Sequence, residues 1–399
     1  MEEKYIKLLV DRCLNFSNTK SLFISYDKVN KSFVDKLVSY VKDKGIEDIY
    51  LDEDDIYLLH DKLINSSLSE ISNDSYFDKS IWDEYAKKGS CFLMLETEFP
   101  GVMDDVSADK IALAKKINRD TRPIFRKREV LYEIPWCIAA LPNELWASHI
   151  FGSDDAYSKL ENILYQICFV DKDDPILEWE KYRSYVKDKV RILDDLCIES
   201  LHYTNSLGTD LYIEMPNNCL WSSIGDELED NMIVNMPSYE IFSSPNYLKT
   251  SGIVYNSRPL MYNGALIDDF YIKFLDGKVV DFKALVGHDI LKSIIEGDEN
   301  SNYLGEVALV NYDSPISNTN VVFGTTLIDE NASCHLALGD GFSHCIVGGE
   351  NMSSEELLEH GINQSRNHVD FMIGTSDLKI EAKTNKGNLV IFEDGNFCI

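Results

Sequence analysis

The first half of the chain alternates between short apolar runs and segments in which apolar residues recur at the helical period. Ser21–Asp27 reads SLFISYD, which predicts a short buried strand. Phe33, Leu37 and Val41 then recur at helical spacing ahead of Gly45, which predicts a helix. Further strands are predicted at residues 46–54, 90–100 and 135–142, and further helices at residues 107–117 and 156–169. Such alternation is typical of an α/β layer with a mostly parallel sheet.

The second half has a different pattern, with most of the glycines and short extended segments. Residues 201–216 predict two strands around a turn at Leu207–Thr209, and Asp276–Gly277 predicts a turn ahead of an apolar strand. The last twelve residues, 388–399, predict a further strand, and the charged helical segment Pro175–Cys197 predicts a connection between domains. We therefore expect an N-terminal α/β domain over residues 1–185 and a β-rich α+β C-terminal domain over residues 186–399.

The charge of the chain narrows its partners. A formal net charge of −30, from 68 acidic and 38 basic residues, excludes a basic footprint for nucleic acid and disfavours an anionic membrane surface. The charge mainly favours solubility, and it also suits weak attraction of a cationic group such as a free amino terminus. The opening residues MEEKYIKLLVDRC lack the apolar core of a signal peptide, and no CxxC pair occurs, so we expect a cytoplasmic protein with reduced thiols.

Acidic residues and histidines with the potential for metal chemistry gather between residues 235 and 370. His368 and Asp370 form an HxD pair, and residues two apart on a strand point to the same face. His335, at the start of an apolar strand, is placed to add an imidazole from a neighbouring strand. The candidate set is Glu240, Glu306, Glu330, His335, His368 and Asp370.

Mixed carboxylate and imidazole ligands suit zinc, manganese or cobalt. More than four such ligands indicate two ions, and in such pairs a carboxylate commonly bridges metals about 3.5–4 Å apart. Each residue alone has a commoner explanation, since a lone Glu is usually a surface charge and a His in an apolar strand is usually a hydrogen-bonded core residue. The chain has no HExxH, no GxSxG and no phosphate-binding glycine loop, and the glycine-rich GDGFSHCIVGG is interpreted as an ordinary loop.

Taken as ordered strings, these segments resemble the thermophilic aminopeptidase family, the metallopeptidases of the aminopeptidase T, S and II type. The similarity covers the C-terminal half strongly and the first half only in fragments such as LPNELWA at residues 141–147. The strings that carry it are GTDL at 208–211, NMPSYEIFSSP at 235–245, DGKVVDFKA at 276–284, LGE at 304–306, DENASCHLALG at 329–339 and NHVD at 367–370.

The resemblance implies a metal site, a fold and an activity. Glu240, Glu306 and Glu330 match the three glutamate positions of the family's site, and the remaining ligands match His335, His368 and Asp370. It implies two divalent ions per chain, a β-rich catalytic domain, a homodimer enclosing the active sites, and removal of the N-terminal residue of peptides. Glu306 would either bridge the metals or act as the general base.

Two departures from the family pattern bear on activity. Ser238-Tyr239 precede the first glutamate where the family usually has Asp-Gly, so we expect a narrowed or reshaped pocket. Phe342 stands seven residues after His335, where the family has a Tyr at the metal centre, so we expect a slower enzyme. Two alternatives stay open: a catalytically silent metal-binding homologue, and a metal-dependent amidohydrolase that acts on a non-peptide substrate.

Overall fold

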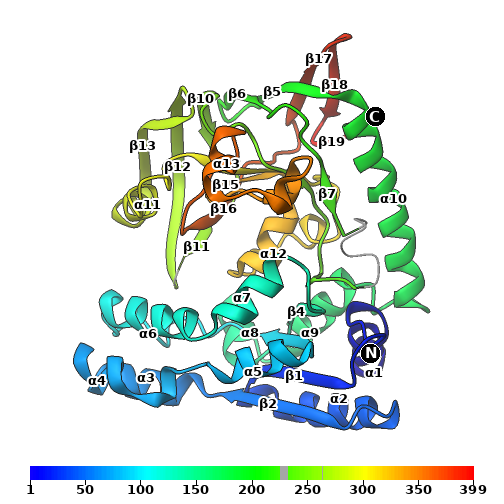
Figure 1. Ribbon diagram of the computed structural model, residues 1–399, viewed down its shortest axis with the longest axis vertical. Coiled ribbons are helices and arrows are strands. Elements are labelled where there is room, and N and C mark those ends of the chain that lie inside the picture. Colours follow the sequence, from blue (N-terminus) through cyan, green and yellow to red (C-terminus); the bar gives the residue numbers. More distant parts are fainter. Residues whose placement is uncertain (225–231, 263) are drawn as a thin grey trace. The chain divides into compact units, whose positions relative to one another are not determined.

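The computed structural model describes residues 1–224, 232–262 and 264–399, which fall into two compact units. The first unit holds residues 1–179 and 232–237, and the second holds the described residues of 180–224 and 238–399. The chain is mixed α/β, with one parallel sheet and two antiparallel sheets (Figure 1). Across the described residues, no helix has both the length and the apolar character that a bilayer crossing requires.

The first unit is built on a five-stranded parallel sheet. In spatial order its strands are β2 (Asp48–Asp54), β1 (Ser21–Asp27), β3 (Cys91–Glu96), β4 (Trp136–Ala140) and β8 (Asn235–Met236). The inner strand β1 is almost wholly buried, whereas the edge strand β2 is half-exposed. This is the expected pattern for a parallel sheet whose faces are covered by helices. The strands predicted at the positions of β1 to β4 are confirmed.

Helices lie on both sides of this sheet (Figure 1). The described helices of the unit are α1 (Glu2–Leu8), α2 (Lys31–Asp43), α3 (Ile56–Asn65), α4 (Leu68–Asn73), α5 (Ile81–Lys88), α6 (Ala108–Asp120), α7 (Pro123–Val130), α8 (Glu144–Phe151) and α9 (Ala156–Ile167). On one face, Phe23 of β1 packs against Trp82 of α5 at 4.8 Å between ring centroids, and Phe92 of β3 packs against Phe125 of α7 at 4.6 Å. The helices predicted near α2, α6 and α9 are confirmed, and the charged segment after residue 174 forms the long helix α10 (Pro175–Leu196).

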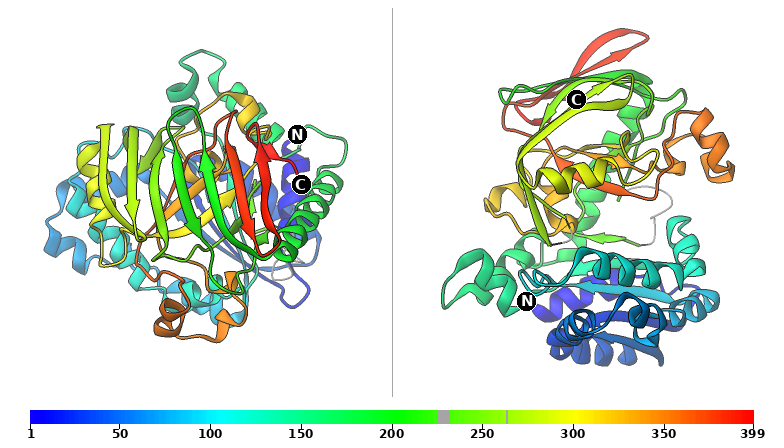
Figure 2. Two further views of the ribbon diagram at one scale, coloured as in Figure 1. Left: turned by 90° about the horizontal axis from the view of Figure 1, so that it is seen from above. Right: turned by 90° about the vertical axis from the view of Figure 1, so that its left-hand side faces the viewer.

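The second unit contains a nine-stranded antiparallel sheet, whose strands Figure 2 shows side by side. They are β5 (Ile198–Thr204), β6 (Asp210–Glu214), β10 (Thr250–Tyr255), β11 (Leu260–Tyr262), β12 (Ala265–Leu275), β13 (Lys278–Val286), β17 (Lys379–Thr384), β18 (Gly387–Glu393) and β19 (Asn396–Phe397). The predicted turn between β12 and β13 is confirmed, because Asp276 and Gly277 both have positive φ, 48° and 80°. Two positive φ angles are the signature of the tight hairpin turn that matches strand twist. The single strand predicted at the end of the chain is instead the pair β18 and β19, which turns back at Asp394–Gly395.

A second antiparallel sheet of this unit is nearly all buried and positions the candidate site. In spatial order its strands are β16 (His368–Met372), β15 (His335–Gly339), β14 (Leu304–Leu309), β9 (Ile241–Ser243) and β7 (Ser222–Ser223). The short helices of the unit are α11 (His288–Ile295), α12 (Thr326–Asp329) and α13 (Ser354–Glu359), and one 3₁₀ turn, Glu330–Ala332, directly follows α12.

Candidate metal centre

Four of the six predicted side chains share one face of strands β14, β15 and β16 of this buried sheet. Ala337 of β15 lies opposite Glu306 of β14 and opposite Asp370 of β16. His335 is two residues from Ala337, and His368 is two residues from Asp370. Since side chains two apart on a strand point the same way, Glu306, Asp370 and both histidines face one side of the sheet.

Glu240 reaches the same face from β9. Ala308 of β14 pairs with Phe242 of β9. Glu306 lies two residues before Ala308, and Glu240 lies two residues before Phe242, so the alternation of the strands puts both carboxylates on one side. The sheet therefore brings five of the six predicted residues together from segments that are far apart in the sequence.

The distances between these side chains are short. Nε2 of His335 lies 3.1 Å from Oε2 of Glu240, and Nε2 of His368 lies 3.1 Å from Oε2 of Glu306 and 3.2 Å from Oδ1 of Asp370. Two overlapping groups have potential ligand atoms within 4.8 Å of one another: Glu240, Glu306 and His335, and Glu306, His368 and Asp370. Glu306 belongs to both groups.

Both histidines are oriented by backbone carbonyl groups. Nδ1 of His335 lies 3.2 Å from the carbonyl oxygen of Ser333, and Nδ1 of His368 lies 2.9 Å from that of Asp340. If each Nδ1 carries the proton and donates it to the carbonyl, each Nε2 is left facing the carboxylates, as in metal-binding histidines. Burial alone would lower the pKa of His335, but the hydrogen bond and charge of Glu240 raise it to about 10. The site therefore favours a cation at this nitrogen.

The acidic side chains of the cluster are buried close together, so their negative charges repel one another. Glu306 and Asp370 are 4% and 8% exposed. Burial raises the pKa of Glu306 to about 7, with the hydrogen bond of His368 opposing this shift and the charge of Asp370 adding to it. Burial, followed by the charges of Asp370 and Glu240, holds the pKa of Glu330 well above its usual range. In residues 1–224, 232–262 and 264–399, no lysine or arginine forms an ion pair with these four carboxylates.

Whether divalent ions fit this site can be judged from a buried carboxylate oxygen that accepts no hydrogen bond. Oδ1 of Asp370 is buried and accepts no hydrogen bond, although Nε2 of His368 is 3.2 Å away. That nitrogen carries at most one proton, and it also lies 3.1 Å from Oε2 of Glu306, so the two carboxylates compete for one donor. A buried carboxylate oxygen that accepts no hydrogen bond is costly unless a cation binds it. Oxygen and nitrogen donors of this kind suit zinc, cobalt or manganese, so the residues fit divalent ions.

Glu330 is the predicted residue that the sheet does not hold. It begins the 3₁₀ turn Glu330–Ala332, which packs against β16. It belongs to neither group of close ligand atoms, and its Oε1 lies 3.3 Å from Nδ2 of Asn331. Its pKa responds to the charges of Asp370 and Glu240, so it lies beside the cluster.

Phe342 lies against one of the candidate histidines. Its ring centroid is 5.1 Å from that of His368, 5.0 Å from that of Phe242 and 5.6 Å from that of His344. Its backbone N–H donates to Oγ of Ser244 at 2.8 Å. The side chain therefore brings a ring without a polar group to the edge of the cluster.

Tyr239, the bulky residue before Glu240, is buried against helix α10. Its ring centroid lies 5.0 Å from that of Tyr182, whose hydroxyl donates to the Tyr239 carbonyl at 2.8 Å. Its backbone N–H donates to Oδ1 of Asn331 at 2.6 Å. Sequence reasoning missed Asn331, although it follows Glu330 directly in DENAS; the expected effect of Tyr239 on the pocket stays a prediction.

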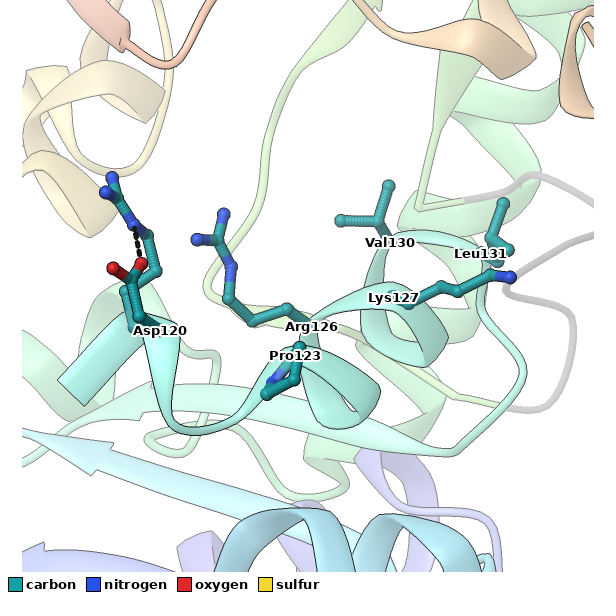
Figure 3. A pocket seen from close by; sticks show the side chains of 7 residues that line it. Asp120, Pro123, Arg126, Lys127, Val130 and Leu131 are labelled. Carbon is teal, nitrogen blue, oxygen red and sulfur yellow. Dashed lines mark hydrogen bonds and ion pairs between the residues drawn. The ribbon is translucent and has the colours of Figure 1, made fainter. Parts of the chain in front are cut away.

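A large hollow of the first unit contains none of the predicted residues. It has a volume of about 600 Å³, and Figure 3 shows its basic side chains, of which Arg119 is paired with Asp120 at 3.3 Å. A cavity of about 10 Å³, the size of one water, touches Asp370 in the second unit. The candidate metal centre therefore rests on the chemistry of its side chains and not on cavity size.

Comparisons with known proteins agree along nearly the whole chain. The model of the family described as "Thermophilic metalloprotease (M29)" matches residues 1–397. The chain is 32% identical to aminopeptidase AmpS of Bacillus subtilis (strain 168), covering 98% of this chain and 97% of that protein. It is also 32% identical to aminopeptidase 2 of Geobacillus stearothermophilus, covering 99% and 97%. The solved structure of wild-type AmpT from Thermus thermophilus superposes with a TM-score of 0.92 at 25% identity, covering 100% of this chain and 99% of that one.

Proposed function

Because the chain belongs to the thermophilic metalloprotease (M29) family, we propose that it is a metal-dependent aminopeptidase that hydrolyses the N-terminal residue from peptides. The two relatives at 32% identity carry the name aminopeptidase and match over nearly their whole lengths. All six candidate ligands match positions that the family resemblance implies, which argues against a silent homologue, since a decayed site usually loses ligands.

The observation that carries this proposal is that Glu306 belongs to both groups of close ligand atoms. We propose that two divalent ions, zinc, cobalt or manganese, would be held at this site, where Glu306 would serve either as a carboxylate available to both ions or as the general base. One ion would take Glu240 and His335, the other His368 and Asp370, and Glu330 would complete the set from beside the sheet. Six donors exceed what one tetrahedral ion uses.

Two ions bound here would lower the pKa of a water molecule and polarise the scissile carbonyl group. The residues of the chain would position the ligands and attract the substrate. Ser333 and Asp340 hold the two imidazoles through their backbone carbonyls. The negative charge of the carboxylates attracts the free amino group of the substrate. The buried sheet keeps the ligands in fixed register, so little reorganisation is needed on binding.

Hydrolysis of aminoacyl p-nitroanilides, with zinc, cobalt or manganese added in turn, tests the proposal. We expect release of p-nitroaniline that depends on metal and disappears when the amino group is acetylated. Equal cleavage of the acetylated compound would favour an amidohydrolase without need of a free amino terminus. Metal binding without any turnover would favour the silent homologue.

The remaining assignments are proposals of the same kind. We propose an N-terminal α/β domain over residues 1–185 and a β-rich catalytic domain over residues 186–399, a homodimer, and a cytoplasmic location. Neither nucleic acid nor a membrane is a proposed partner, given the net charge of −30. Size measurement in solution tests the dimer.

A further inference from the structure

We propose that Asn331 is the positioning residue that fixes Glu330 against the metal ligands carried by the sheet. This inference rests on the proposed function, because it concerns the same metal centre. Asn331 is fully buried. Its side chain is the described link between the turn that carries Glu330 and the strand that carries Glu240.

Glu330 needs such a link because the sheet does not hold it. The other five proposed ligands lie on or next to strands β9, β14, β15 and β16, and the backbone ladders fix their register. Glu330 begins a short 3₁₀ turn outside these ladders. A long carboxylate side chain at such a place loses rotamer freedom only if another group holds it.

The side chain of Asn331 holds both sides at once. Its Oδ1 accepts a hydrogen bond from the backbone N–H of Tyr239 at 2.6 Å. Its Nδ2 donates to Oε1 of Glu330 at 3.3 Å and to the carbonyl oxygen of Leu327 at 3.4 Å. Tyr239 directly precedes Glu240, so one amide connects the backbone next to one ligand with the carboxylate of another.

Other groups anchor this segment, so the fold of the segment does not depend on Asn331 alone. The carboxylate of Asp329 accepts hydrogen bonds from the backbone N–H groups of Phe323 and Gly324 at 2.9 and 2.7 Å. An amide is suited to the role of Asn331, because it offers an acceptor and two donors without adding charge to an acidic cluster. The bond to Glu330 is the one that a purely structural role does not require.

Removing the amide should weaken metal binding. Partners that hold a metal ligand from behind typically contribute 10- to 100-fold to metal affinity. We expect Asn331→Ala to raise the Kd for cobalt about 10- to 100-fold and to change the visible absorption of the bound cobalt, because Glu330 is no longer held in place.

Asn256 supplies a matched control. Its Oδ1 accepts from the backbone N–H of Phe270 at 2.7 Å, and its Nδ2 donates to Oδ1 of Asp268 and to the carbonyl of Arg258, both at 2.9 Å. It thus bonds a backbone amide, a carboxylate and a carbonyl, as Asn331 does, but in the nine-stranded sheet. We expect Asn256→Ala to bind cobalt within about twofold of the unchanged protein.

The experiment is a calorimetric and absorption titration of the metal-stripped full chain with cobalt. Equal Kd values in Asn331→Ala and Asn256→Ala would overturn the inference. So would an added loss of affinity when Asn331→Ala is combined with Glu330→Gln, because a residue that acts through Glu330 has nothing more to remove. If Asn331→Ala does not fold, Asn331→Ser, whose hydroxyl is too short to join both partners, is titrated by the same criteria. Fewer than two cobalt ions in the unchanged chain would count against the proposed function, whereas the ratio between the variants and that chain decides the role of Asn331.

Discussion

Each unit of the molecule gathers carboxylates at a five-stranded sheet, but the two sheets neutralise them differently. At β2 of the parallel sheet, Nζ of Lys79 lies 3.0 Å from Asp52 and 2.9 Å from Asp54, and the indole N–H of Trp82 donates to Asp52 at 2.8 Å. On the buried antiparallel sheet, no described lysine or arginine pairs with the four carboxylates of the cluster, Glu240, Glu306, Glu330 and Asp370.

A structural ion pair and a candidate cation-binding site differ in whether the chain itself supplies the neutralising cation. A cation that the chain itself supplies makes an acidic group part of the fold. Buried carboxylates with only histidines as partners have an unfavourable charge that an external cation relieves. Altering one of the two clusters, with the other as control, tests this difference.

The largest effect should come from changing the shared carboxylate of the antiparallel sheet. Glu306→Gln keeps the shape of the side chain and removes its charge, so we expect kcat/KM to fall at least about 10²–10³-fold, about 3–4 kcal/mol. Steady-state kinetics on an aminoacyl p-nitroanilide measure this, with thermal unfolding to show that the fold is intact. Asp54→Asn in the parallel sheet should leave kcat/KM within about twofold. More than about a tenth of the original activity in Glu306→Gln, a loss under ~1.4 kcal/mol, would contradict its role.

Removing the metal should affect the second cluster next most strongly. We expect close to two ions per chain after purification without chelator, and loss of both on chelation. Rebinding at a metal concentration about 100 times Kd should stabilise the fold by about 2.7 kcal/mol per site. Elemental analysis and unfolding with and without cobalt measure these quantities. One ion or none after reconstitution would rule out the dinuclear site.

The built-in cation of the first sheet should have a somewhat smaller effect, on stability alone. Despite burial, the charges of Asp54 and Asp52 raise the pKa of Lys79, so it is cationic at neutral pH. Lys79→Met leaves two carboxylates without their cation, and we expect a loss of about 2 kcal/mol in the free energy of unfolding. Urea unfolding measures it, with metal affinity unchanged.

The same variant predicts a pH dependence. Burial and the charge of Asp52 raise the pKa of Asp54, and Lys79 opposes this shift. Without Lys79 the folded state therefore binds more protons at Asp54 than the unfolded chain in mildly acidic solution. The loss in the free energy of unfolding that Lys79→Met causes should therefore become smaller as the pH falls from 7 toward about 4. Lys88→Met is the control, since its pair with Asp48 spans 3.8 Å and both side chains are half-exposed, and it should cost less than about 0.5 kcal/mol. A loss in the free energy of unfolding that grows at low pH would contradict the role assigned to Lys79.

Much of the fold was predictable where the signal is local. Ser21–Asp27 is the strand that its apolar run predicts, and Asp276–Gly277 makes the predicted turn. Helices α3 and α4 were missed, although Asp55 caps the first and Ser67 with Glu70 forms a capping box for the second. The buried residue is Leu63 in the first and Ile71 in the second, so neither helix has a repeating buried face and periodicity alone gave a weak signal there.

Some features of the candidate site were likewise predictable from local sequence, and others were not. The HxD spacing predicted that His368 and Asp370 share a face, and the register of β16 agrees. That β14 pairs with β9 on one side and β15 on the other depends on sheet order, which no local pattern contains. The bond from Tyr239 to Asn331 depends on the same long-range order, so sequence reasoning had no signal for it.

The smallest effect should come from adding a hydroxyl at Phe342, where the cluster of the antiparallel sheet lacks a hydrogen-bond donor. The ring lies 5.1 Å from that of His368 and adds no polar group, whereas Trp82 donates an N–H to the acidic pair of the other sheet. A donor to the oxyanion that develops on the substrate is typically worth 10²–10³ in rate. Since a new hydroxyl will not have ideal geometry, we expect Phe342→Tyr to raise kcat about tenfold, about 1.4 kcal/mol, and to change KM less, because the phenol acts mainly in the transition state. Phe282→Tyr is the control, because its ring also packs against a histidine, His288 at 5.3 Å, but on β13 of the nine-stranded sheet, so a hydroxyl there should not raise kcat. An unchanged or lower kcat in Phe342→Tyr would mean that another group has taken over the donor's role or that position 342 does not reach the chemistry.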